Sequence, residues 1–135
     1  MDLMKSILVS ASGMAAQSER MKVIAENLAN ANSTAKTPGG DPYRRKLVTF
    51  QDHLDKQLGV EKVSVQGITE DQSDFELKYD PGHPAADANG YVKLPNVNSL
   101  IEISDMREAS RTYEANLSAI DAAKTMLART VDLLR

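Results

Sequence analysis

Residues 99–135 read SLIEISDMREASRTYEANLSAIDAAKTMLARTVDLLR, and they carry the strongest structural pattern in the chain. Ten positions in it follow an unbroken alternation of three- and four-residue steps, the heptad pattern of a helix that packs lengthwise on other helices. Eight of the ten are apolar, whereas the 41% hydrophobic content of the chain would give about four. The positions are Ile103, Met106, Ser110, Tyr113, Leu117, Ile120, Lys124, Leu127, Val131 and Leu134.

The predicted C-terminal helix is long for so short a chain. At 1.5 Å per residue it would extend roughly 55 Å. A compact domain of 135 residues has a radius of gyration of only about 14 Å. The helix therefore cannot be hidden inside a compact body of its own chain, and we expect it to need partner helices.

Composition narrows the class of protein. Aromatic residues make up only 4% of the chain, which limits the size of a self-contained core. Cysteine is absent, which excludes disulfides, thiol catalysis and cysteine-ligated zinc. The net charge of −3 provides no basic field for nucleic acid or anionic membrane. No apolar run reaches the ~18 residues of a membrane span, and the N-terminal residues do not form the pattern of a cleaved signal peptide.

The N-terminal part repeats the helical pattern more weakly over residues 3–28. Its apolar stripe comprises Leu3, Ile7, Met14, Met21, Ile24 and Leu28, filled in by Ala11 and Ala25. We expect the helix to stop at Asn30 or Asn32, because asparagine tolerates the left-handed backbone conformation. The sequence thus divides into an N-terminal helix within residues 1–34, a β-rich middle over 35–98 and a C-terminal helix over 99–135.

The middle part contains short strand patterns separated by turns. Alternating apolar residues predict strands over 43–50, 60–65, 75–79 and 90–95, and residues 51–58 suggest a short helix ending at Gly59. Ser99 and Glu102 have the spacing of a capping box at the start of the long helix. The predicted fold is therefore mainly α-helical, with two long terminal helices packed as a coiled-coil-like layer and a small, irregular β-rich insert.

Several stretches resemble the rod subunits of the bacterial flagellum. Residues 12–17 and 24–32 (IAENLANAN) look like the N-terminal motif that rod and hook subunits share, and residues 108–116 (EASRTYEAN) look like their C-terminal signature. Residues 39–45 (GGDPYRR), 79–92 (YDPGHPAADANGYV) and 94–98 (LPNVN) are more specific to subunits of the proximal rod. The chain therefore resembles the flagellar rod and hook axial protein family over nearly its whole length.

The resemblance implies a structural subunit of the basal-body rod, the drive shaft that transmits torque. It implies export without a cleaved signal peptide through the flagellar type III apparatus, followed by helical assembly on the periplasmic side through the terminal helices. The implied partners are other rod subunits, further copies of the chain, the inner-membrane ring and the rod-base adaptor. It implies no cofactor and no small-molecule substrate.

We predict that the subunit interface comes from both terminal helices. In the C-terminal helix it comprises Ile103, Met106, Tyr113, Leu117, Ile120, Leu127, Val131 and Leu134, and in the N-terminal helix Ile7, Met14, Met21, Leu28, Asn27, Asn30 and Asn32. The three asparagines either bond a neighbouring subunit or simply end the helix. Ser110 and Lys124 either fix the register of the seam or lie at its margin, with the lysine stem along apolar surface.

No stretch of the sequence carries an enzyme motif. His53 and His83 lie in separate segments without metal-ligand spacing, and the serines lack the Gly-x-Ser-x-Gly context of a hydrolase. Arg44, Arg45 and Lys46 are more consistent with a solvated or subunit-contacting strand than with a phosphate site. The remaining alternatives are a distal-rod or hook-type subunit, or a cytosolic coiled-coil adaptor that would be folded and dimeric on its own.

Overall fold

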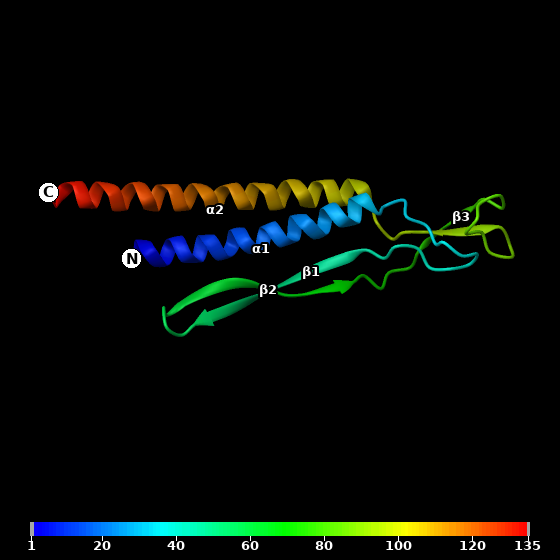
Figure 1. The fold of residues 1–135 in the computed structure, drawn as a ribbon, viewed down its shortest axis with the longest axis horizontal. Coiled ribbons are helices and arrows are strands. Elements are labelled where there is room, and N and C mark those ends of the chain that lie inside the picture. Colours follow the sequence, from blue (N-terminus) through cyan, green and yellow to red (C-terminus); the bar gives the residue numbers. More distant parts are fainter. Residues whose placement is uncertain (1, 135) are drawn as a thin grey trace. The chain divides into compact units, whose positions relative to one another are not determined.

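The computed structural model describes residues 2–134 of the chain (Figure 1). Two long helices, α1 (Leu3–Ala29) and α2 (Ser99–Leu133), enclose four strands in the sequence. The strands β1 (Lys46–Asp55) and β2 (Val60–Glu70) form one two-stranded sheet, and β3 (Glu76–Tyr79) and β4 (Tyr91–Leu94) form another. The predicted fold class, two packed terminal helices with a small β insert, is confirmed.

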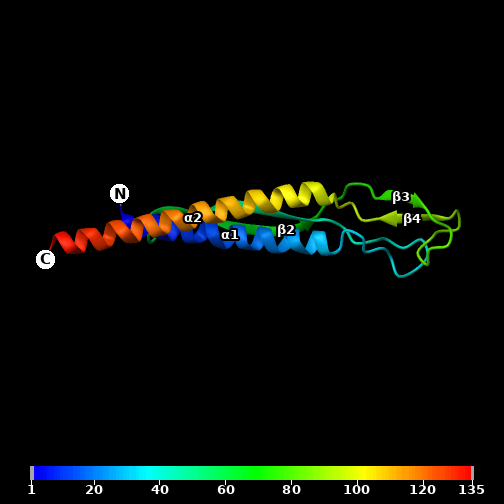
Figure 2. The ribbon, with the colours of Figure 1, turned by 90° about the horizontal axis from the view of Figure 1, so that it is seen from above.

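The chain divides into two compact units, each of which contains parts of both helices. The first unit comprises the chain up to Met21, Val48–Gly67 and the chain from Arg107. The second unit comprises Lys22–Leu47 and Ile68–Met106. Within each unit, α1 and α2 lie side by side and run in opposite directions (Figures 1 and 2).

The buried apolar core is small. Four of the seven buried apolar residues of the described chain are alanines. The seven are Ala16, Val23, Ile24, Ala85, Val92, Ala109 and Ala123. Alanine contributes little burial energy, since each buried methylene adds only about 0.8 kcal/mol. No helix in residues 2–134 combines the length and apolar content needed to cross a membrane.

The short helix predicted over residues 51–58 is wrong. Strand β1 continues to Asp55, and a turn at residues 56–59 leads directly into β2. Gly59 has a φ of 62°, and its N–H donates to the Asp55 carbonyl at 2.7 Å. The Asp55 carboxylate accepts hydrogen bonds from the backbone N–H groups of Gln57 and Leu58. It also forms an ion pair with Lys62. Pairing between the two strands outweighs the helical preference of a short polar segment.

The predicted helix ends also need correction. Asn98, and not Ser99, caps α2, because its side-chain oxygen accepts from the backbone N–H groups of Leu100 and Ile101. Glu102 does not fold back on the cap and is buried elsewhere. Helix α1 does stop next to Asn30, but no non-glycine residue in the described chain has a positive φ. The Asn30 side-chain amide instead donates to the Glu26 carbonyl at 2.9 Å, so this carbonyl in the last turn of the helix has a hydrogen-bond donor without a left-handed residue.

Strands β3 and β4 pair antiparallel in the second unit, with Leu77 opposite Lys93 and Tyr79 opposite Tyr91. The two tyrosine rings contact edge to face at 5.3 Å between centroids. The connecting loop is fixed at Gly90, whose φ is 82° and whose missing side chain leaves room for the Tyr79 ring; a Cβ there would lie 2.9 Å from that ring. The strands predicted near 60–65, 75–79 and 90–95 are confirmed.

Candidate assembly surface

A buried asparagine connects α1 to the start of β1 in the second unit. Asn27 is only 1% exposed. Its side-chain oxygen accepts from the Lys46 N–H at 2.9 Å and from the Tyr43 hydroxyl at 2.8 Å. Its amide nitrogen donates to the Lys46 carbonyl at 2.9 Å and to Glu102 at 3.1 Å. The side chain thus pairs with both backbone groups of Lys46, much as a neighbouring strand would.

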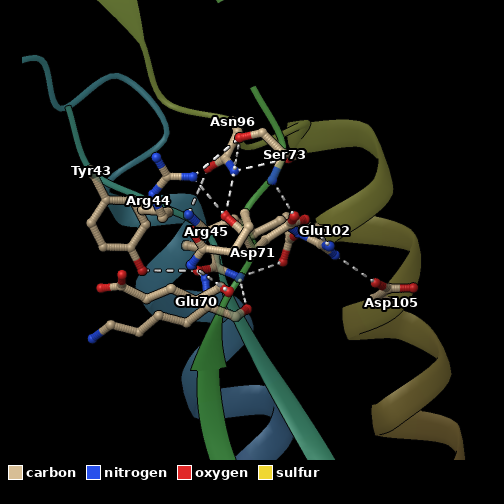
Figure 3. A network of polar contacts seen from close by, with 12 residues as sticks. Tyr43, Arg44, Arg45, Glu70, Asp71, Ser73, Asn96, Glu102 and Asp105 are labelled. Atoms are coloured by element: carbon tan, nitrogen blue, oxygen red, sulfur yellow. Dashed lines mark hydrogen bonds and ion pairs between the residues drawn. The ribbon is translucent and has the colours of Figure 1, made fainter. Parts of the chain in front are cut away.

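Arg45 joins α2 to the same network. Its guanidinium donates to the buried carboxylate of Glu102 and also lies 3.5 Å from Asp71 and 3.6 Å from Asp105 (Figure 3). The backbone N–H of Arg45 donates to the Asn96 side chain at 2.8 Å. A buried charge is tolerated only when it is paired and hydrogen-bonded, and Glu102 has both Arg45 and Asn27.

Three members of the network, Asp71, Tyr43 and Arg45, have pKa values shifted from their ordinary values. Hydrogen bonds from the backbone and hydroxyl of Ser73 lower the pKa of Asp71, and the Arg45 guanidinium lowers it further. Burial raises the pKa of Tyr43, and the nearby carboxylates of Glu26 and Glu102 add to that effect. Burial alone would lower the pKa of Arg45, but Glu102 and Asp71 raise it above its ordinary value. The lowered pKa keeps Asp71 ionised at neutral pH beside the Arg45 guanidinium, so the network acts as a charged structural clamp.

In the first unit the helices approach each other through small and polar residues. A Cβ at Gly13 would lie 2.9 Å from the Asn116 amide nitrogen, and Arg20 pairs with Glu108 at 3.2 Å. The glycine therefore permits a close helix contact, which offsets its cost of about 1 kcal/mol in a helix interior. The side-chain oxygen of Gln17 is buried without a hydrogen-bond partner. This seam holds the helices in register but provides little apolar burial.

Helix α2 carries three heptad rows. The inner row, which is buried or half-buried against the rest of the chain, consists of Glu102, Ala109, Asn116 and Ala123. A neighbouring shared row is half-buried throughout and consists of Met106, Tyr113, Ile120 and Leu127. The next row, here called the outer row, faces solvent except for half-buried Ser110 and consists of Ile103, Ser110, Leu117, Lys124 and Val131.

The outer row leaves large apolar side chains uncovered. Ile103 is 42% exposed, Leu117 43% and Val131 58%. Lys124 lies within this row and is exposed. Together with the half-buried apolar residues of the shared row, these side chains form an apolar stripe typical of a helix that packs on another helix.

Helix α1 presents a matching half-buried stripe. Ile7, Met14, Met21 and Leu28 recur every seven residues, and each is half-buried. The three predicted interface asparagines are separated by the fold. Asn27 contacts its own chain, Asn30 bonds the helix end, and Asn32 is exposed in the following turn.

Comparison with known proteins agrees with this geometry. Residues 7–35 match the family described as flagella basal body rod protein, and residues 88–133 match flagellar basal body rod FlgEFG protein C-terminal. The flagellar basal-body rod protein FlgC of Agrobacterium fabrum is 54% identical over 127 residues, which cover 94% of this chain and 91% of that protein.

Two further relatives have the same name. The Salmonella typhimurium protein is 42% identical and the alignment covers 98% of both chains. The Bacillus subtilis protein is 43% identical and the alignment covers 95% of both chains. The chain belongs to the FlgC family.

Family membership confirms the resemblance seen in the sequence. This FlgC-family chain is a structural, non-enzymatic subunit of the proximal rod of the flagellar basal body, where it assembles with other rod proteins. The alternatives of a distal-rod or hook-type subunit and of a cytosolic coiled-coil adaptor are excluded by this result.

Three other candidate site residues, Arg44, Lys46 and His83, have partners within their own chain. Arg44 lies 4.2 Å from the centroid of the Phe75 ring and donates to the backbone carbonyls of Asp71 and Ser73. Lys46 pairs with Glu26 at 3.2 Å, and His83 accepts from the Ala85 N–H. Within residues 2–134 no group of three or more potential ligands could hold a metal ion.

Sequence reasoning missed two sets of residues. The first is the polar network, because the spacing of Glu102 indicates a cap and Asp71 and Asn96 carry no local pattern that links them to Arg45. The second is a set of exposed apolar residues on other faces of α2: Leu100, Ile101, Met126 and Leu133. Their spacing falls outside a single heptad row, and only their exposure identifies them.

Proposed function

We propose that the FlgC-family chain enters the rod through the outer and shared rows of α2, together with the half-buried stripe of α1. The observation that carries this proposal is the exposure of Ile103, Leu117 and Val131 on one side of a helix whose other side already packs on its own chain. Leu134, which directly follows the end of α2 at Leu133, is also exposed and adds to this apolar surface.

The inner and outer sides of α2 would have different tasks. The inner row, with Glu102 and Asn116, fixes how the helix sits on its own chain through hydrogen bonds and close contacts. The outer row is free of such bonds and offers apolar area, which contributes about 25 cal/mol per Å² when it is buried. Lys124 within that row would then favour one register, because an unpaired buried charge is costly.

The small core supports a specific order of events. We infer that the chain passes through the flagellar type III apparatus loosely folded and that its two ends become fully ordered when they dock on the rod. Ordering the backbone costs about 1–2 kcal/mol per residue, which a core containing four alanines does not easily offset. Burial of the helix stripes against several neighbours would offset it and make assembly cooperative.

The proposed partners beyond the rod subunits are the inner-membrane ring and the rod-base adaptor. A second copy of this chain would contact the same helix surfaces in a helical array. Such a contact would be heterologous, since a two-fold contact closes and does not propagate.

The test uses the absence of cysteine from the chain. A Leu117→Cys variant is expressed in a deletion strain, and maleimide labelling is measured on the free protein and on isolated basal bodies. We expect rapid labelling of the free protein and strong protection in the rod. Equal labelling rates in both states would show that the outer row is not an interface.

A further inference from the structure

Strand β3 has an open edge in the second unit. It pairs only with β4 among the described strands, and all four of its residues are exposed. Figure 2 shows β3 at the margin of the small sheet, with β4 on one side and no strand on the other. Exposed strand edges present unpaired N–H and C=O groups that can accept a further strand.

The ladder shows which residues face that edge. The Asp80 N–H donates to the Gly90 carbonyl at 2.9 Å, in the same register as the pairs of β3 and β4. Hydrogen-bonded and non-hydrogen-bonded pairs alternate along an antiparallel ladder. The even-numbered residues of β3 therefore bond β4, while Leu77 and Tyr79 direct their backbone groups to the open edge.

Two hollows lie beside the strand, and Glu76 of one and Leu77 of the other alternate along it and so point to opposite faces. One, of about 440 Å³, is lined by Asp74 and Glu76 together with residues 95–99 and Ser73. The other, of about 480 Å³, is lined by Asp74, Phe75, Leu77 and Lys93. Side chains of an added strand would point alternately to the two faces, so successive side chains would meet the two hollows in turn.

The two hollows differ in chemistry. Asp74 and Glu76 are exposed, and neither carboxylate forms an ion pair within residues 2–134. Phe75 and Leu77 give the second hollow an apolar wall, and its Lys93 is already paired with Asp41 at 2.9 Å. The first hollow therefore suits a basic side chain and the second an apolar one.

The approach to β3 is held rigidly. Asn96 donates to the Ser73 hydroxyl at 2.9 Å and to the Asp71 carbonyl at 3.0 Å. Arg44 holds the Phe75 ring by a cation–π contact. A fixed edge loses less conformational freedom on binding, which favours recognition.

We propose that the open edge of β3 binds an extended peptide segment of a partner protein in which basic and apolar residues alternate. The segment pairs its backbone with Leu77 and Tyr79, places basic side chains beside Asp74 and Glu76, and places apolar side chains against Phe75 and Leu77. This is strand addition with a pocket for each alternate side chain. The β3 edge is separate from the rows of α2, so this proposal can be tested independently of the proposed rod interface.

The probe is a fluorescein-labelled peptide of alternating lysine and valine, six residues long, titrated into the full chain and followed by fluorescence anisotropy. We expect saturable binding at low salt that weakens as salt is raised, because exposed charge pairs are screened. In two-dimensional NMR spectra, the amide signals of Leu77 and Tyr79 should shift. Two control peptides accompany it: one has three lysines followed by three valines, and the other is the alternating peptide with N-methyl groups on alternate amides.

Two protein variants give a matched comparison. The double variant Asp74→Asn and Glu76→Gln should bind about fivefold more weakly, as expected when two exposed ion pairs are lost. The double variant Asp52→Asn and Glu61→Gln removes the same charge from exposed positions of the first unit and should bind as the parent chain does. The proposal is overturned if no saturable binding occurs, if either control peptide binds as tightly as the alternating one, or if the two double variants bind equally.

Discussion

Replacement of Leu117 by aspartate should block entry into the rod while leaving the isolated chain intact. Full burial of a leucine side chain is worth about 2 kcal/mol. Leu117 is 43% exposed in the chain, and burying this exposed part would contribute about 1 kcal/mol. An aspartate there would forfeit that gain and place an unpaired carboxylate in an apolar contact, at a cost of about 4 kcal/mol in total. This corresponds to roughly a thousandfold weaker contact.

The chain itself should tolerate the change, because substitutions at exposed positions usually alter the free energy of unfolding by less than about 0.5 kcal/mol. The matched control is Ala119→Asp, which adds the same charge at an exposed position of α2 outside the outer row. Both variants are expressed in a deletion strain and scored for swimming, for extracellular filament subunits and for rod completion in isolated basal bodies. Circular dichroism of the purified proteins compares their helix content. If the Leu117→Asp strain swims as well as the strain carrying the parent chain, the outer row is not an essential interface.

Three further changes address the second unit. Glu102→Ala should lower the free energy of unfolding by about 3 kcal/mol, because it leaves Arg45 without its principal partner. A loss below ~1 kcal/mol in urea titrations would show that the polar network does not act as a structural clamp. Gly90→Ala should lower the free energy of unfolding by about 1–3 kcal/mol, because alanine is strained at a φ of 82° and its Cβ meets the Tyr79 ring. Thermal melting tests this prediction, and an unchanged melting midpoint would contradict it. The folded-state pKa of Asp71 lies below 3.8, so its contribution to stability is present above that pH and is lost as the pH falls through the folded value. Asp71→Asn should therefore flatten the acid limb of the stability profile, and an unchanged limb would exclude Asp71 as the source.

The helical part of the fold could be predicted because its signal is long and local. The heptad pattern of residues 99–135 extends over five repeats, and both helices form where the pattern predicts them. The pattern could not show which row faces the chain. The shared row, which includes Met106 and Tyr113, lies between the inner row and the outer row and fits a contact on either side. The actual inner row contains Glu102 and Asn116, which look like surface residues until distant residues supply their partners.

The errors in the middle part have a similar cause. Residues 51–58 have no strong local preference, and the partner strand β2 decides their conformation. The Ser99 and Glu102 spacing fits a capping box, but Asn98 competes for the cap and Arg45 for the carboxylate. The sequence around Asn27 shows a helix residue and gives no sign that the backbone of Lys46 lies against it.

The separation of the two sides of α2 has an evolutionary consequence. Residues that keep the chain folded and residues that would choose its neighbours lie on different rows of one helix, joined only by the shared row. Substitutions in the outer row can therefore change the neighbour without unfolding the subunit. A set of related subunits could diverge in this way from a single ancestor, each retaining the same folded body while acquiring its own position in a mixed assembly.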